Sequence, residues 1–189
     1  MKNNGKLIVI SGPSGVGKGT ICRELIKRHE NISVSVSATT RSPRNEDKEG
    51  VTYFFKTKEQ FEKMIAEGKF LEWANYNGNY YGTPAAAVDE SLEKGKNIIL
   101  EIEVQGALSI METRPDAISI FVVPPDEETL FERLKGRGTE NLDEIEKRME
   151  VAKWELSQKD KYKYVVVNDR LEDAISQIEN IIKNEKGNI

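Results

Sequence analysis

The chain has 189 residues, of which 38% are hydrophobic and 32% charged, a balance that allows one compact soluble core with small attached subdomains but excludes a membrane-embedded chain. Its net charge of -4 disfavours a general nucleic-acid-binding surface, and its single cysteine, Cys22, can form neither an internal disulfide nor a cysteine-based metal cluster. We therefore expect a cytoplasmic protein without nucleic-acid or membrane partners, whose oligomeric state the sequence leaves open.

The first predicted element is a strand at residues 7–10, an apolar run too short for a secretory signal or a membrane helix. A glycine-rich loop follows, and then a helix with apolar positions at Ile21, Cys22, Leu25 and Ile26. Glycines let a backbone wrap around an anion at the positive end of a helix, and a lysine adds a full charge. The alternative is a glycine-rich turn without a nucleotide role. The residues expected to bind a polyphosphate are Gly12, Pro13, Ser14, Gly15, Val16, Gly17, Lys18, Gly19 and Thr20.

This loop departs from the usual phosphate-loop pattern at one position. The pattern places a hydroxyl directly after the lysine, where this chain has Gly19, and Thr20 comes one residue later. Magnesium ligands are therefore not assigned, although Thr20 and Glu101 are candidates for contact through water.

Residues 33–83 predict a small β-rich insertion, with turn signals at Gly50 and Asn77-Gly78 and one short helical pattern around Phe61. Two arginines, Arg41 and Arg44, are spaced to bind phosphate oxygens, because guanidinium groups match them in pairs. Tyrosine and threonine hydroxyls in the same segment are neutral donors. The alternatives are a solvated basic turn for the arginines and edge-strand positions for the tyrosines.

Further apolar runs at residues 98–100, 118–123 and 164–167 predict strands, each followed by a helical pattern. This alternation favours an α/β fold with a parallel sheet covered by helices. Charged helices around the Gly136-Arg137-Gly138 break have a composition typical of a mobile lid. The expected division is core with phosphate loop, 1–32; insertion, 33–83; core, 84–125; lid, 126–158; and C-terminal strand and helix of the core, 159–189.

Several segments together resemble the guanylate kinases, a family of nucleoside monophosphate kinases with a P-loop. They are GPSGVGK at 12–18, TTRSPR at 39–44, FLEW at 70–73, GNYYG at 78–82, VQG at 104–106 and RLKGRGT at 133–139. The resemblance implies transfer of the γ-phosphoryl group of ATP to GMP, with Mg²⁺. It also implies that the β-rich insertion binds the monophosphate and that the helical lid closes over ATP.

The resemblance also implies the residues that hold the acceptor. It places Arg41, Arg44, Tyr53 and Tyr81 around the GMP phosphate, and Ser37, Glu72 and Thr83 around the guanine base. Physical chemistry supports Glu72, because one carboxylate can accept the adjacent N1-H and N2-H donors of guanine. The alternative for Glu72 is an exposed strand carboxylate.

Acidic residues follow the run at 98–100. Glu101 ends it, where P-loop proteins commonly place an acid near Mg²⁺, and Glu103 comes two residues later. Along an extended strand both would point to the same face, so we expect both in the site, with their separate roles open.

The resemblance assigns Arg133, Arg137 and Arg148 to the lid, as groups that cover the transferring phosphoryl together with Lys18. The alternative is that these arginines are solvated helix charges. Asn168 is placed either at the adenine base or at a helix cap. Two other functions stay open at this point: a guanylate-kinase-like module that binds phosphorylated protein segments, and a kinase for another nucleoside monophosphate.

Overall fold

A parallel sheet forms the centre of the molecule. The computed structural model describes residues 4–76, 78–136 and 142–185. The sheet contains β2 (Ile32–Val34), β7 (Asn97–Glu101), β1 (Leu7–Ser11), β8 (Ile118–Val123) and β9 (Tyr164–Val167), in that order. Every neighbouring pair is parallel. The predicted parallel sheet is confirmed.

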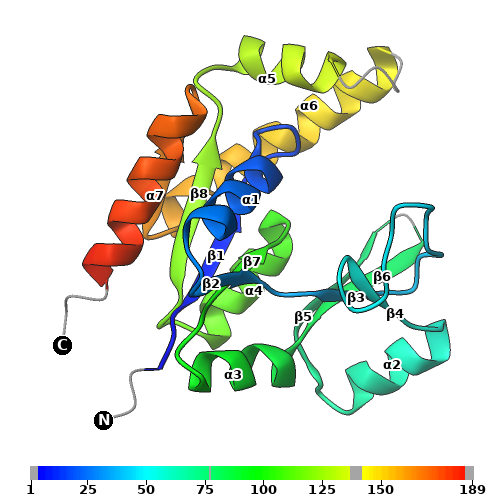
Figure 1. Ribbon diagram of the computed structural model, residues 1–189. Helices are drawn as coiled ribbons and strands as arrows, with labels where there is room; N and C mark the ends of the chain where they lie inside the picture. Colours follow the sequence, from blue (N-terminus) through cyan, green and yellow to red (C-terminus); the bar gives the residue numbers. More distant parts are fainter. Residues whose placement is uncertain (1–3, 77, 137–141, 186–189) are drawn as a thin grey trace.

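Helices cover both faces of this sheet (Figure 1). Alternate residues of β1 point to opposite faces: Ile8 and Ile10 pack with α1 (Lys18–Arg28) and α7 (Leu171–Glu185), while Leu7 and Val9 pack with α3 (Ala85–Glu93) and α4 (Val104–Thr113). A strand buried on both faces must be apolar throughout, which is why residues 7–10 lack a polar alternation.

The insertion is a second sheet with the strand order β4-β3-β6-β5. Its strands are β3 (Ser37–Thr39), β4 (Tyr53–Phe55), β5 (Phe70–Tyr76) and β6 (Asn79–Pro84). Helix α2 (Lys58–Ala66) packs on it through Phe61, whose fully buried ring stacks on Phe70 at 4.4 Å and on Tyr80 at 5.2 Å between ring centroids. Thr57 and Gln60 form a capping box that starts α2.

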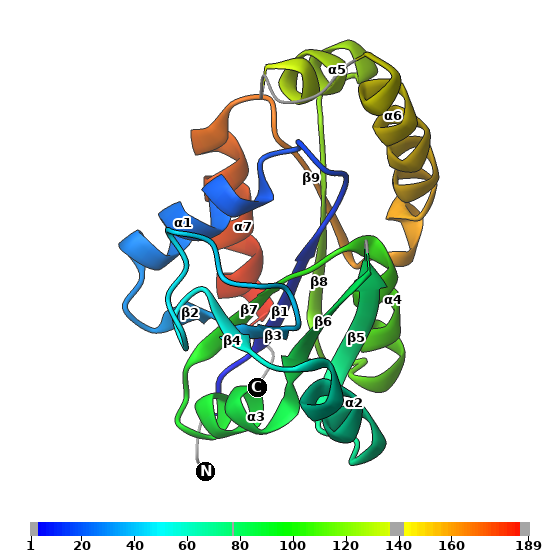
Figure 2. The same cartoon turned by 90° about the vertical axis from the view of Figure 1, so that its right-hand side faces the viewer.

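Two further helices, α5 (Glu127–Lys135) and α6 (Leu142–Ser157), lie beyond the carboxyl ends of the core strands (Figure 2). They pack together through Leu130, Leu134, Ile145 and Ala152. The short 3-10 helix η1 (Lys159–Lys161) connects α6 to β9. Each helix in the described ranges is too short or too polar to cross a lipid bilayer.

The structure corrects three expectations. Helix α1 starts at Lys18 rather than at Ile21, and Ile26 lies at its surface with 37% of its area exposed. Glu103 does not share a strand face with Glu101, because β7 ends at Glu101 and Glu103 is the N-cap residue of α4. Because the chain changes from strand to helix between Glu101 and Val104, side chains no longer alternate between the two faces of a strand at Glu103.

Candidate active site

The loop between β1 and α1 has a backbone that only glycine accommodates easily. Gly12 has a φ of 142°, and a Cβ there would lie 2.2 Å from the carbonyl oxygen of Val122. Gly17 has a φ of 98°, and a Cβ there would lie 2.5 Å from Nδ2 of Asn168. The loop can therefore curl tightly against β8 and Asn168 only without side chains at these positions.

Lys18 is the first residue of α1 and is nearly buried, with 9% of its area exposed. Its Nζ donates hydrogen bonds to the carbonyl oxygens of Gly12, at 2.5 Å, and Pro13, at 3.1 Å. The ammonium thus lies across the loop. The N-cap residue of α1, Gly17, has no side chain to cap the helix, and the first turn of α1 holds no acidic residue. The amide groups at the start of α1 and the charge of Lys18 therefore favour a bound anion.

Glu101 lies against the start of α1. A Cβ on Gly19 would be 3.2 Å from its Oε1, so the glycine leaves room for this carboxylate. Burial raises the pKa of Glu101, and the charges of Lys18 and Arg23 oppose that rise. Thr20 follows Gly19, and its Oγ1 accepts a hydrogen bond of 3.0 Å from Nη2 of Arg23.

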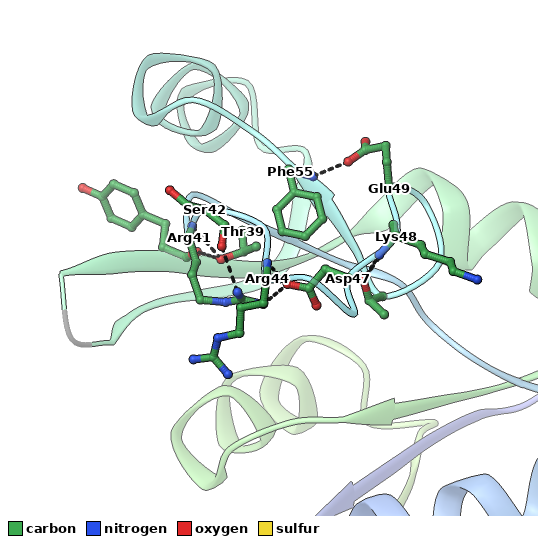
Figure 3. Close-up of polar contacts among 10 residues, drawn as sticks. Thr39, Arg41, Ser42, Arg44, Asp47, Lys48, Glu49 and Phe55 are labelled. Atoms are coloured by element: carbon green, nitrogen blue, oxygen red, sulfur yellow. Dashed lines mark hydrogen bonds and ion pairs between the residues drawn. The ribbon is translucent and has the colours of Figure 1, made fainter.

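The insertion brings predicted phosphate ligands together, and Figure 3 shows two of them, Arg41 and Arg44. The Cζ atom of Arg41 lies 5.3 Å from the ring centroid of Tyr53, and the rings of Tyr53 and Tyr81 are 6.2 Å apart. Asp47, which sequence reasoning did not single out, accepts a hydrogen bond from Nη2 of Arg41 at 2.8 Å and one from the backbone N–H of Arg44 at 2.7 Å. The cluster is therefore two arginines, two tyrosines and one carboxylate.

Glu72 lies where the insertion meets the core. Its Oε1 accepts a hydrogen bond of 2.7 Å from Oγ1 of buried Thr83. Its Oε2 lies 2.8 Å from the point that a Cβ on Gly106 of α4 would occupy. Burial raises the pKa of Glu72, and the hydrogen bonds from Thr83 oppose the rise. Ser37, at the start of β3, pairs in register with Tyr53, which places it in the same small sheet.

An electrostatic link joins the insertion to the phosphate loop. The pKa of Tyr53 is raised mainly by burial, then by Tyr81, and the negative charge of Glu101 adds to the rise. Glu101 in turn lies against Gly19 and interacts with Lys18. Glu101 is therefore within electrostatic range both of Tyr53 in the cluster and of Lys18 in the loop.

Two of the arginines that we expect in the lid, Arg133 and Arg148, contact the loop region. Nη2 of Arg133 donates to the carbonyl oxygen of Asn168 at 3.0 Å, and Nδ2 of Asn168 donates to that of Val16 at 2.8 Å. Nη1 of Arg133 is buried and has no hydrogen-bond partner among the described residues. Nη2 of Arg148 donates to Oγ of Ser14 at 2.6 Å. Arg137 lies outside the described residues.

Sequence reasoning also missed Glu155, a buried carboxyl on α6 that receives a hydrogen bond from the backbone of Ser14 and interacts with Glu103. Nothing in the helical pattern of 145–156 marks this position, because a glutamate beside an apolar stripe normally faces water. Asp47 had a weak local signal, since aspartate side chains in turns often hydrogen-bond to nearby backbone groups.

Glu155 makes the stability of the fold depend on pH. Burial raises its pKa from 4.5 to about 7, Glu103 adds to the rise, and Lys18 opposes it. The folded state keeps this proton to a higher pH than the unfolded chain, so stability declines as pH rises from about 4.5 to about 7. At pH 8 we expect the free energy of unfolding of Glu155→Gln to exceed that of wild type by about 2 kcal/mol. This difference should disappear toward pH 5, where the wild-type carboxyl is protonated in the folded state.

Urea denaturation at both pH values measures this effect. Glu150→Gln, an exposed position on the same helix, is the control and should track the wild type at both. An identical gap between Glu155→Gln and wild type at pH 5 and pH 8 would show that the carboxyl does not titrate in this interval.

The fold and site define a P-loop protein with an arginine–tyrosine cluster in an insertion, and comparison with known proteins identifies the family. Residues 4–185 match the family model described as guanylate kinase. A guanylate kinase of Halalkalibacterium halodurans is 54% identical over 97% of this chain and 90% of its own length, and one of Shouchella clausii is 53% identical over the same shares. A crystal structure of guanylate kinase from Anaplasma phagocytophilum has a TM-score of 0.78 and 34% identity, covering 98% of this chain and 88% of that one. The chain belongs to the guanylate kinase family.

Proposed function

We propose that the protein transfers the γ-phosphoryl group of ATP to GMP, reversibly, giving ADP and GDP. The observation that carries the proposal is the position of Glu101, which lies against Gly19 of the phosphate loop and within electrostatic range of Tyr53 in the arginine–tyrosine cluster, so that the two groups of cations lie near one carboxylate. Two phosphate groups bound at such sites are positioned for in-line transfer.

On the donor side, Lys18 and the amide groups at the start of α1 bind the phosphates of ATP. Arg148 reaches this loop through Ser14, and Arg133 reaches it through Asn168. Nη1 of Arg133, which has no hydrogen-bond partner within the described ranges, is a buried donor suited to a phosphate oxygen. These cations oppose the charge that spreads over the transferring group, and we assign the same role to Arg137.

On the acceptor side, Arg41, Arg44, Tyr53 and Tyr81 bind the phosphate of GMP. Glu72, held by Thr83, accepts the two adjacent N–H groups of guanine, and Ser37 completes the base site. No catalytic base is required, because the attacking phosphate oxygen is already largely ionised near neutral pH. We place the reaction in the cytoplasm, with residues 33–83 as the acceptor-binding part and 126–158 as the lid that excludes water.

The residues fit Mg²⁺ held largely through water. Gly19 leaves space beside the carboxylate of Glu101, an oxygen donor of the type that this ion prefers, and Thr20 offers a nearby hydroxyl. When bound with ATP, the ion neutralises charge on the β- and γ-phosphates. Glu103 is the N-cap residue of α4 rather than a strand residue, and it interacts with both Glu155 and Glu101, so we assign it to the loop environment.

A coupled assay of ADP release with GMP, AMP, CMP and UMP tests this function. We expect turnover with GMP to exceed that with AMP by about 10⁴-fold in kcat/KM, because AMP leaves the Glu72 carboxylate without donors. Equal turnover with AMP would indicate a kinase for another nucleoside monophosphate. Binding of GMP without ADP release would favour a binding module.

A further inference from the structure

Asp47 connects the two arginines of the insertion through one oxygen atom. Its Oδ2 accepts the side-chain hydrogen bond from Arg41 and the backbone hydrogen bond from Arg44 (Figure 3). The ion pair is largely shielded, with 15% of the Arg41 side chain and 12% of the Asp47 side chain exposed. The Asp47 backbone N–H also donates to the carbonyl oxygen of Arg44 at 3.0 Å, which closes the turn.

Arg41 is held from several sides. Its Nη1 donates to the carbonyl oxygen of Ser42 at 2.8 Å, its backbone N–H donates to Oγ1 of Thr39 at 3.1 Å, and its guanidinium lies over the ring of Tyr53. Arginine has five N–H donors, so these contacts leave others for a ligand. The ion pair with Asp47 further restricts the orientation of the guanidinium plane.

A carboxylate in this position has two opposing effects on an incoming phosphate. Its charge repels the anion, while its hydrogen bonds hold Arg41 and Arg44 in one arrangement and so reduce the rotamer entropy lost on binding. The hydrogen bond from the Arg44 backbone N–H, and after it the hydrogen bond and charge of Arg41, keep the pKa of Asp47 below its usual range against the effect of burial, so the carboxylate is charged at neutral pH. Since Arg41 neutralises that charge at 2.8 Å, the ordering effect outweighs the repulsion.

We propose that Asp47 is a positioning residue for the acceptor's phosphate, which orients the guanidinium of Arg41 and the backbone of Arg44 before the monophosphate binds. The inference rests on the proposed function of the insertion as the GMP site. It assigns to Asp47 no contact with GMP itself.

The test is Asp47→Asn, which keeps the shape of the side chain and removes its charge. We expect KM for GMP to rise about tenfold, with kcat within about twofold of wild type and KM for ATP unchanged. Asp47→Glu keeps the charge and should recover part of the loss. Glu49→Gln is the matched control, because Glu49 lies in the same turn and accepts a backbone N–H, from Phe55 at 2.9 Å, as Asp47 does from Arg44.

Guanosine distinguishes positioning of the phosphate ligands from general damage to the site. Its inhibition constant against GMP should be unchanged by Asp47→Asn, since guanosine has no phosphate for the arginines to bind. An unchanged or lowered KM for GMP, or an equal loss for guanosine and GMP, overturns the inference. If Asp47→Asn does not fold, Asp47→Glu decides: we expect a smaller rise in KM for GMP with guanosine inhibition unchanged, and an equal loss for guanosine and GMP contradicts the inference.

These results separate the inference from the function on which it rests. A wild-type protein that does not phosphorylate GMP contradicts the proposed function. A wild-type protein that does so, alongside an Asp47→Asn variant with the same KM for GMP, contradicts only the role of Asp47.

Discussion

Replacing Lys18 by methionine is expected to lower kcat for phosphoryl transfer by about 10³-fold or more. The methionine keeps most of the aliphatic stem but removes the ammonium that lies across the loop, hydrogen-bonded to the carbonyl oxygens of Gly12 and Pro13. Without the ammonium, one full positive charge fewer stabilises the negative charge that develops on the transferring group. ADP release in the presence of GMP and ATP measures the loss.

The control for this variant is Lys27→Met on the same helix. Lys27 is exposed and pairs with Glu24 at 2.5 Å, so its removal should leave kcat unchanged. Thermal melting establishes that both variants are folded. If folded Lys18→Met protein retained more than a tenth of the wild-type rate, the loop would not be the donor site.

Replacing Glu72 by glutamine is expected to lower kcat/KM for GMP by about 10² to 10³-fold while leaving KM for ATP unchanged. The amide presents an N–H group where guanine also presents N–H groups, so at least one donor loses its acceptor. The hydrogen bond from Thr83 fixes the side chain in this place, which limits its escape to solvent.

Steady-state rates at varied GMP and varied ATP separate the two effects. Glu90→Gln is the control, because Glu90 is an exposed carboxylate paired with Lys94 on α3. An unchanged rate with GMP in the Glu72→Gln variant would remove this residue from the base site.

Local patterns predicted the core and the loop because the responsible forces act over short stretches of chain. An apolar run followed by closely spaced glycines and a lysine can form little other than a strand, a tight anion-binding turn and a helix. The same logic failed at Glu103, where the chain changes from strand to helix directly after Glu101. A period of two holds only while the backbone stays extended.

Contacts between distant parts of the chain left no such local signal. Arg148 and Ser14 are 134 positions apart, and Arg133 and Asn168 are 35 apart, so their pairing depends on how α5 and α6 lie over the sheet. The burial of Glu155 has the same origin. By contrast, the resemblance to guanylate kinases singled out Arg133 and Arg148 as expected site residues, because it uses segments from the whole chain, and their contacts are consistent with that expectation.

The central claim is direct transfer between two anion sites, and ATP labelled in its γ-phosphoryl group tests it most directly. With GMP present, the account predicts that the label passes to GDP, with little released as inorganic phosphate. Label appearing as inorganic phosphate at the same rate with and without GMP, or label remaining in ATP while GMP is bound, would contradict it.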